Sequence, residues 1–196
     1  MIHSFNEQLA FSQSKEGAID DIYKNYFKNV VKITRLPFGQ RQRVGIDTVV
    51  QLASGEEIRT QEKWRTRPFS GDFLIETCSV WKNGECVKPG WIYTIDAEYI
   101  FAVYAPSQLV KIYPVTQLKL AWDSNKDDWM RSYHIPPARN RGYETHNIAV
   151  PCAVLESALL STMSFSYQRQ LTDSYSQGDY SVVNESAPHY TLKEVS

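Results

Sequence analysis

Hydrophobic positions first follow a helical period between residues 16 and 31. The apolar side chains in this stretch are Ile19, Ile22, Tyr23, Tyr26, Phe27 and Val30. They recur every three or four residues, which predicts an amphipathic helix over 16–31. Ser14 is a suitable N-cap for it.

The pattern then changes to short runs rich in β-branched and aromatic residues, which predict strands. Expected strands cover 31–36, 44–52, 57–64 and 72–80, and the last ends at the Asn83-Gly84 turn. A short helical turn is expected over 94–99. A second hairpin is expected from 100–104 and 109–115, followed by a helix over 116–123 that continues towards Trp129.

The C-terminal third is less regular. Residues 132–146 are rich in Pro, Arg, Gly and Asn, which predicts a long loop. Pro151 suits the first position of a further helix. Residues 164–196 contain seven serines and little periodicity, so we expect a polar tail. The order of elements predicts an α/β domain over 1–163, in which helices flank a mixed sheet.

Composition limits the class of protein. The 196 residues are 42% hydrophobic and 22% charged, as in an ordinary globular chain. No apolar run approaches the roughly 18 residues of a membrane helix, so we expect no membrane association. The first residues lack a signal-peptide pattern, and the 3 cysteines form no CxxC pair. We therefore expect free thiols in a reducing cytoplasm, in a bacterial or phage-infected cell.

Charge is unevenly distributed, although the net charge is only -1. Residues 24–67 contain 10 Lys and Arg against 4 Asp and Glu, a local excess of +6 that leaves -7 for the remainder. Such a segment is typical of a face that meets an anion. A solvated surface with no ligand is the alternative.

Side-chain alternation in the hairpin around Ser54-Gly55 places polar groups together. A three-residue loop over 54–56 pairs Val50 with Thr60 and keeps apolar residues opposite apolar residues. In that register Asp47 lies opposite Lys63. Asp47, Gln61 and Lys63 then share one face of the hairpin, and Glu62 points from the other.

A carboxylate, an amide oxygen and an ammonium group on one face suggest a site that binds a metal ion and acts on a phosphate. Oxygen ligands suit Mg²⁺, and a lysine can assist a water molecule or stabilise charge on a phosphate. Glu16, at the start of the expected helix, could reach the same place. The alternative is an ordinary cross-strand salt bridge between Asp47 and Lys63.

The pattern Gly45-Ile46-Asp47, a hairpin and Gln61-Glu62-Lys63, after an acidic helix, resembles the PD-(D/E)XK nuclease superfamily. The resemblance covers roughly residues 16–120. It also includes the strand 72–76 and Gly90-Trp91-Ile92, which are similar to phage-type members. It implies a restriction-endonuclease-like core: a helix, a mixed four-stranded sheet and a second helix.

The resemblance assigns roles by position. Asp47 matches the metal-binding aspartate, Gln61 the second acidic position, Lys63 the catalytic lysine and Glu16 the helix carboxylate, with Asp20 as a substitute. It implies hydrolysis of DNA phosphodiester bonds with Mg²⁺ or Mn²⁺. Ile46 replaces the proline of the motif, and Gln61 replaces a carboxylate. Glu16 or Glu76 would then supply the missing charge.

The implied substrate is DNA, and the expected phosphate contacts come from the basic segment and from a later loop. These residues are Arg41, Arg43, Arg65, Arg67, Arg139, Arg141 and Tyr143. Many relatives dimerise, so a homodimer or a larger complex is a further expectation. Two alternatives stay open. One is a catalytically inactive nuclease fold that binds nucleic acid or serves as a subunit, and the other is a protein-interaction module that uses the tail.

Overall fold

The computed structural model describes residues 16–37, 39 and 45–162. The tail over 164–196 and the side chains of Arg41 and Arg43 lie outside the described residues, as does the side chain of Glu16. No helix among the described residues is long and apolar enough to cross a membrane.

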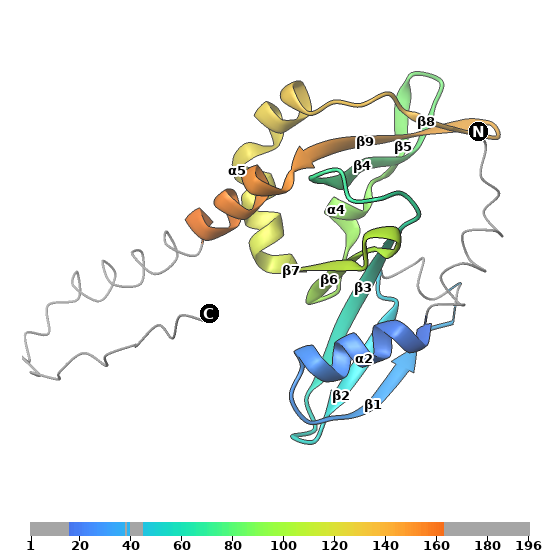
Figure 1. Ribbon diagram of the computed structural model, residues 1–196. Helices are drawn as coiled ribbons and strands as arrows, with labels where there is room; N and C mark the ends of the chain where they lie inside the picture. Colours follow the sequence, from blue (N-terminus) through green and yellow to red (C-terminus); the bar gives the residue numbers. More distant parts are fainter. Residues whose placement is uncertain (1–15, 38, 40–44, 163–196) are drawn as a thin grey trace, which may run out of the picture. The chain divides into compact units, whose positions relative to one another are not determined.

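Helix α2 and the strands of the described residues form a mixed α/β structure with two sheets (Figure 1). Sheet A has the order β1-β2-β3-β6-β7, and sheet B has the order β5-β4-β9-β8. The bounds in chain order are α2 Glu16–Tyr26, β1 Val30–Arg35, β2 Thr48–Leu52, β3 Glu57–Arg65, β4 Asp72–Lys82, β5 Glu85–Pro89, α4 Trp91–Thr94, β6 Tyr99–Tyr104, β7 Leu109–Pro114, α5 Val115–Ser132, β8 Ala138–Asn140 and β9 Tyr143–Pro151. Residues 152–162 are helical.

Sheet A is mixed, as the sequence predicts. Strands β1, β2 and β3 are antiparallel neighbours, and β3 then pairs in parallel with β6. A parallel pair needs a crossover connection. Here the connection contains β4, β5 and α4. Strand β4 of sheet B therefore follows β3, the strand that contains Lys63, directly in the chain.

Two apolar clusters cover the two faces of sheet A. Helix α2 packs on one face through Ile19 and Tyr23, and Phe27 follows directly after the helix; all three share a cluster with Phe101 and Val103 of β6. The opposite side chains of β6, including Ile100 and Ala102, belong to the larger cluster. That cluster joins sheet A to α4, α5, sheet B and the helical residues 152–162, so sheet A lies between α2 and the rest of the domain.

The helix predicted over 16–31 is shorter, because Asn29 adopts a left-handed conformation (φ 60°) and β1 begins at Val30. The short helical turn predicted over 94–99 lies earlier, at Trp91–Thr94. Pro151 ends β9 and so precedes the last helix rather than opening it.

The loop predicted over 132–146 is wrong in part, because it contains β8 and the start of β9. The turn at Arg141-Gly142 joins these strands, and Gly142 has φ +83°. Strand β5 was also not expected after Asn83-Gly84. Both segments are polar and exposed, so they lack the alternation that indicates a half-buried strand. Pairing with β4 and β9 makes them strands.

The expectation of free thiols is wrong for two of the cysteines. Cys78 and Cys86 form a disulfide across the β4–β5 hairpin, with Cα atoms 5.9 Å apart. A separation of eight residues does not by itself indicate a disulfide. The two cysteines come together because the turn at Asn83-Gly84 continues into strand β5, which pairs with β4. Cys152 is free and buried.

Candidate functional site

The β2–β3 hairpin has a different register from the predicted one, but the same faces. Val50 pairs with Ile58 and Thr48 with Thr60, so the strands are shifted by two residues from the expected pairing. The loop is 53–55, because the Leu52 N–H donates to the Glu56 carbonyl oxygen (2.9 Å) and Gly55 takes the left-handed conformation (φ +89°). A shift of two preserves every face, since side chains alternate with period two.

Extending this pairing places Asp47 opposite Gln61 rather than Lys63. The Asp47 N–H donates to the Thr60 carbonyl oxygen (2.8 Å). The Glu62 N–H in turn donates to the carboxylate Oδ2 of Asp47 (2.8 Å), which fixes this side chain against β3. These two contacts hold Asp47 against β3, the strand that also contains Gln61 and Lys63.

Gln61 is buried, with 9% of its surface exposed. Its side-chain oxygen Oε1 has no hydrogen-bond partner among the described residues. Gly45, with φ +64°, lies beside it. A Cβ added at Gly45 would stand 3.7 Å from Gln61 Nε2 and 3.2 Å from the Cα of Ile95. A buried amide oxygen without a partner is unusual, and it is the kind of atom that a cation or a bound water satisfies.

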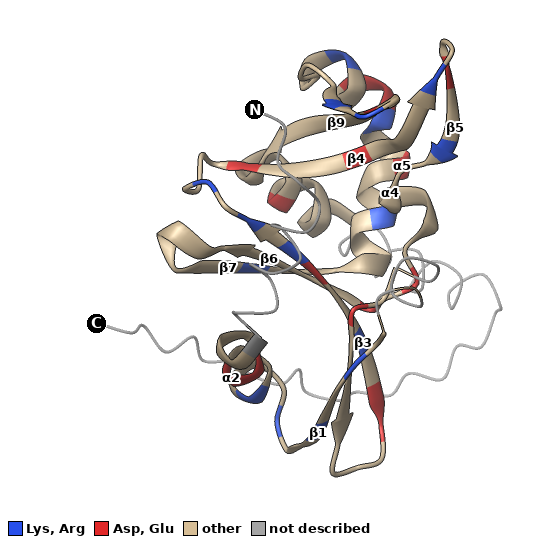
Figure 2. Ribbon diagram, turned by 90° about the vertical axis from the view of Figure 1, so that its right-hand side faces the viewer, with Lys and Arg blue, Asp and Glu red and all other residues tan. Residues whose placement is uncertain are grey.

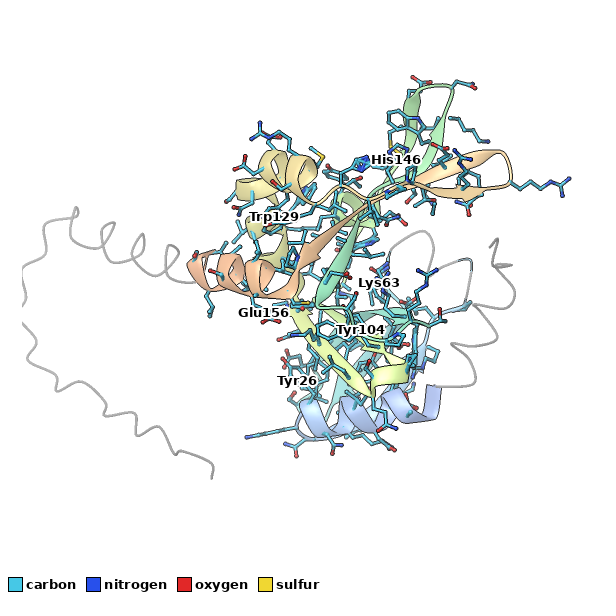
Figure 3. The ribbon with its side chains drawn as sticks, turned by 45° about the horizontal axis from the view of Figure 1, so that its top comes forward. Tyr26, Lys63, Tyr104, Trp129, His146 and Glu156 are labelled. Carbon is cyan, nitrogen blue, oxygen red and sulfur yellow. A yellow bond between two sulfur atoms is a disulfide. The ribbon has the colours of Figure 1, made fainter. Side chains whose placement is uncertain are left out.

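Lys63 points into a groove between sheet A and sheet B. The groove has a volume of about 310 Å³, and it is lined by residues of β3, β4, β6, β9 and α4. Its lining residues are Glu62, Lys63, Trp64, Arg65, Phe73, Leu74, Glu76, Trp91, Ala102, Tyr104 and Asn147. Lys63 and Tyr104 are labelled in Figure 3, where Lys63 lies near the middle of the domain.

The ammonium group of Lys63, a half-buried residue, lies over an aromatic ring. Its nitrogen lies 4.9 Å from the centroid of the Trp91 ring, within the range of a cation–π contact. Burial lowers the pKa of Lys63, and the nearby carboxylates of Asp47 and Glu76 partly oppose this by raising it. Lys63 thus stands close to one carboxylate of its own hairpin and to one from the other sheet.

Glu76 was named from the sequence only as a substitute for a missing charge. It pairs with Asn147 across β4 and β9, and its carboxylate accepts a hydrogen bond from Ser79 Oγ. Gly90 packs directly on its backbone: a Cβ added there would lie 2.0 Å from the Glu76 carbonyl oxygen. This close approach brings Trp91 to the groove.

Trp91 and Asn147 were not predicted as site residues. Gly90-Trp91-Ile92 belonged to the resemblance, but nothing in the sequence connected Trp91 with Lys63. Asn147 belongs to β9 and directly follows the segment expected to be a loop. Asn147 reaches the groove because β9 pairs with β4, and Trp91 reaches it because Gly90 packs on the backbone of Glu76. Both are contacts between segments distant in sequence.

The opposite face of β3 holds a separate polar network. The carboxylate of Glu62, with 7% of its side chain exposed, contacts Arg35 and accepts hydrogen bonds from Tyr23 (2.9 Å), Thr48 (3.0 Å) and the indole of Trp64 (2.9 Å). Asp20 of α2 joins it by pairing with Arg35. Asp20, the substitute for Glu16, thus contacts Arg35 beneath α2.

The other predicted residues are spread over the surface. Arg65 lines the groove and lies 3.6 Å from Asp72, whereas Arg67 is exposed next to it in the chain. Arg139, Arg141 and Tyr143 are exposed at the β8–β9 turn, at the far end of sheet B. Figure 2 shows further Lys and Arg positions along the strands of both sheets.

Within residues 16–37, 39 and 45–162, no group of three or more His, Cys, Asp and Glu side chains is placed to hold a metal ion. The oxygen donors present are the carboxylates of Asp47 and Glu76 and the buried amide oxygen of Gln61. Such hard oxygen donors suit Mg²⁺, which keeps several of its waters.

Comparison of the chain with protein-family models, with curated proteins and with solved structures found no match.

Proposed function

We propose that this protein is a metal-dependent nuclease that hydrolyses DNA phosphodiester bonds. The observation that supports it is the gathering of Asp47, Gln61 and Lys63 on one face of the β2–β3 hairpin, with the Gln61 oxygen buried and unpartnered among the described residues. The proposed fold is a restriction-endonuclease-like core made of α2 and the mixed strands β1, β2, β3 and β6.

The proposed metal ligands are Asp47, Gln61 and Glu16. Gln61 offers a neutral oxygen in place of a carboxylate, so the site needs negative charge from elsewhere. Glu76 lines the Lys63 groove and offers a carboxylate from sheet B, whereas Asp47 and Gln61 are not among the residues that line this groove. Mg²⁺ or Mn²⁺ held by the proposed ligands supplies positive charge that activates water and offsets the charge developing on the phosphate.

The chain's own residues then position the substrate and the proton. Lys63 lines the groove and burial lowers its pKa, which favours the neutral amine that can take a proton from the attacking water. Its charged form can equally stabilise the phosphate. Arg65 lines the groove beside Lys63 and offers a guanidinium to a neighbouring phosphate.

The test is nicking of supercoiled plasmid and cleavage of a branched DNA, with Mg²⁺ and with Mn²⁺. The native protein is compared with Asp47→Ala and Lys63→Ala, and with Lys126→Ala, a surface lysine of α5 paired to Asp123. Cutting that requires metal, survives in Lys126→Ala and disappears in the other two variants supports the nuclease. Salt-sensitive DNA binding without cutting favours the inactive nuclease fold.

Gln61→Glu gives a second test that does not depend on turnover. A buried carboxylate without a cation is costly, so this variant should melt at a lower temperature than the native protein in a chelator. Mg²⁺ should restore its stability, and by more than it stabilises the native protein. Equal melting temperatures with and without Mg²⁺ would count against a metal site at Gln61.

A further inference from the structure

The far end of sheet B contains a second hollow, away from the Lys63 groove. It lies between the turns of the β4–β5 and β8–β9 hairpins and has a volume of about 480 Å³. This is within the range of pockets that hold small ligands. Its lining residues are Trp81, Lys82, Asn83, Gly84, Arg139, Asn140, Gly142, Tyr143 and Glu144.

The lining includes two aromatic residues, Trp81 and Tyr143, and two basic residues, Lys82 and Arg139. Trp81 is held rigidly, because its ring stacks on His146 with centroids 4.5 Å apart and an angle of 28° between the planes. Tyr143 is 36% exposed. Lys82 and Arg139 are exposed, and the one acidic group in the lining, Glu144, lies 3.7 Å from Arg139. Rigid aromatic faces with nearby cations are what unpaired nucleotides bind.

The hollow is joined to the groove by a continuous pair of strands. Glu76 pairs with Asn147 at the groove, and Trp81 pairs with Glu144 at the hollow. The two levels are five residues apart on β4 but only three apart on β9, because the register shifts between them, so they are separated by about 10–16 Å along the strands. His146, labelled in Figure 3, lies where the two hairpins extend away from the rest of the domain.

We propose that the hollow binds an unpaired base of the DNA substrate, so that the substrate has single-stranded character a few nucleotides from the cleaved bond. This rests on the proposed function. Tyr143 and Trp81 supply stacking faces, Lys82 and Arg139 meet the adjoining phosphates, and the amide of Asn83 faces the base edge. Base stacking tolerates all sequences, so little sequence preference is expected from this contact.

The experiment uses the full chain in a chelator, so that no cutting occurs. A single-stranded oligonucleotide with 2-aminopurine is compared with the same strand in a duplex, by fluorescence and by anisotropy. Stacking on Tyr143 should quench the fluorescence of the single strand but not that of the duplex. Tyr143→Leu should reduce the quenching and weaken binding about 5- to 150-fold, whereas Tyr143→Phe should preserve both.

Two outcomes would overturn the inference. One is equal affinity for single strand and duplex with no effect of Tyr143→Leu. The other is salt-sensitive binding without a change in 2-aminopurine fluorescence, which would indicate contacts to the backbone alone. The same experiments separate this inference from the proposed nuclease activity. If quenching depends on Tyr143 but the protein never cuts DNA, the nuclease proposal fails and the proposal that the hollow binds a base is retained. If the protein cuts DNA but Tyr143→Leu changes neither the quenching nor the affinity, the proposed base site fails and the nuclease proposal is retained.

Discussion

The ammonium nitrogen of Lys63 lies 4.9 Å from the centroid of the Trp91 ring. The two residues belong to different parts of the chain, β3 and α4, and meet because Gly90 packs against the backbone of Glu76. Trp91 thereby closes one side of the groove and removes water from the lysine. The lowered pKa of Lys63 is a consequence of this packing together with the other residues that enclose the ammonium group.

Trp91→Ala should raise the pKa of Lys63 towards its ordinary value of 10.5, because water then reaches the ammonium group. The measurement is an NMR titration of ¹³C-dimethylated lysines, with Lys63→Arg identifying the resonance. Tyr93→Ala, an exposed aromatic of the same helix, is the control and should leave the titration unchanged. An unaltered Lys63 titration in Trp91→Ala would show that Trp91 does not desolvate the lysine.

Lys63→Met should make the protein more stable near neutral pH, since desolvation outweighs the attraction of Asp47 and Glu76. Lys63 has a folded pKa below its unfolded value of 10.5, so the unfolded chain keeps this proton to higher pH. Native stability therefore rises with pH between the lowered pKa and 10.5. The advantage of Lys63→Met, measured by urea unfolding, should shrink across that window. A constant difference between the two proteins would contradict this.

Gly90→Ala should destabilise the domain by more than about 2 kcal/mol, since the added Cβ would lie 2.0 Å from the Glu76 carbonyl oxygen and the backbone would have to move. Gly17→Ala in α2 is the matched control. Among the described residues, no atom outside the helix lies within 4 Å of its added Cβ, and alanine favours a helix by about 0.5–1 kcal/mol. Chemical denaturation should therefore move the two variants in opposite directions. A neutral Gly90→Ala would show that α4 is not seated on β4 as described.

Arg35→Ala should cost about 3–5 kcal/mol, because it leaves the buried carboxylate of Glu62 without its cation. Arg59→Ala provides the comparison. Arg59 pairs with Asp96 and Glu98 at the surface, where such pairs contribute about 0–1 kcal/mol. Equilibrium unfolding of the two variants measures the difference, and similar losses in both would mean that the Glu62 network adds little.

A reducing agent should lower the melting temperature of the native protein, because the Cys78–Cys86 disulfide closes the β4–β5 hairpin. A loop of this size stabilises the folded state by about 2–3 kcal/mol when it unfolds with the rest of the domain. Cys86→Ser should melt at the temperature of the reduced protein and should not respond to the reductant. If the reducing agent does not change the melting temperature of the native protein, either the β4–β5 hairpin unfolds independently of the rest of the domain or the Cys78–Cys86 disulfide is absent.

The local sequence pattern was enough to predict those helices and strands whose apolar residues recur with a regular period and face the core. The helix that presents Ile19 and Tyr23 to the core lies within the predicted range, and it ends before Asn29, which is left-handed. The strands 57–64 and 72–80 were predicted to within one or two residues of β3 and β4. In the β2–β3 hairpin the register was predicted two residues out, yet Asp47, Gln61 and Lys63 kept their common face.

The sequence by itself therefore determined which residues of the hairpin can act together, because alternation along a strand is a local property that a shift of two does not disturb. Only the tertiary structure placed Glu76, Trp91 and Asn147 around Lys63. Those contacts depend on the parallel pairing of β3 with β6 and on sheet B packing beside it, between segments that are distant in sequence. Such pairings are decided by how the whole core buries its apolar faces, and no short pattern in the chain specifies them.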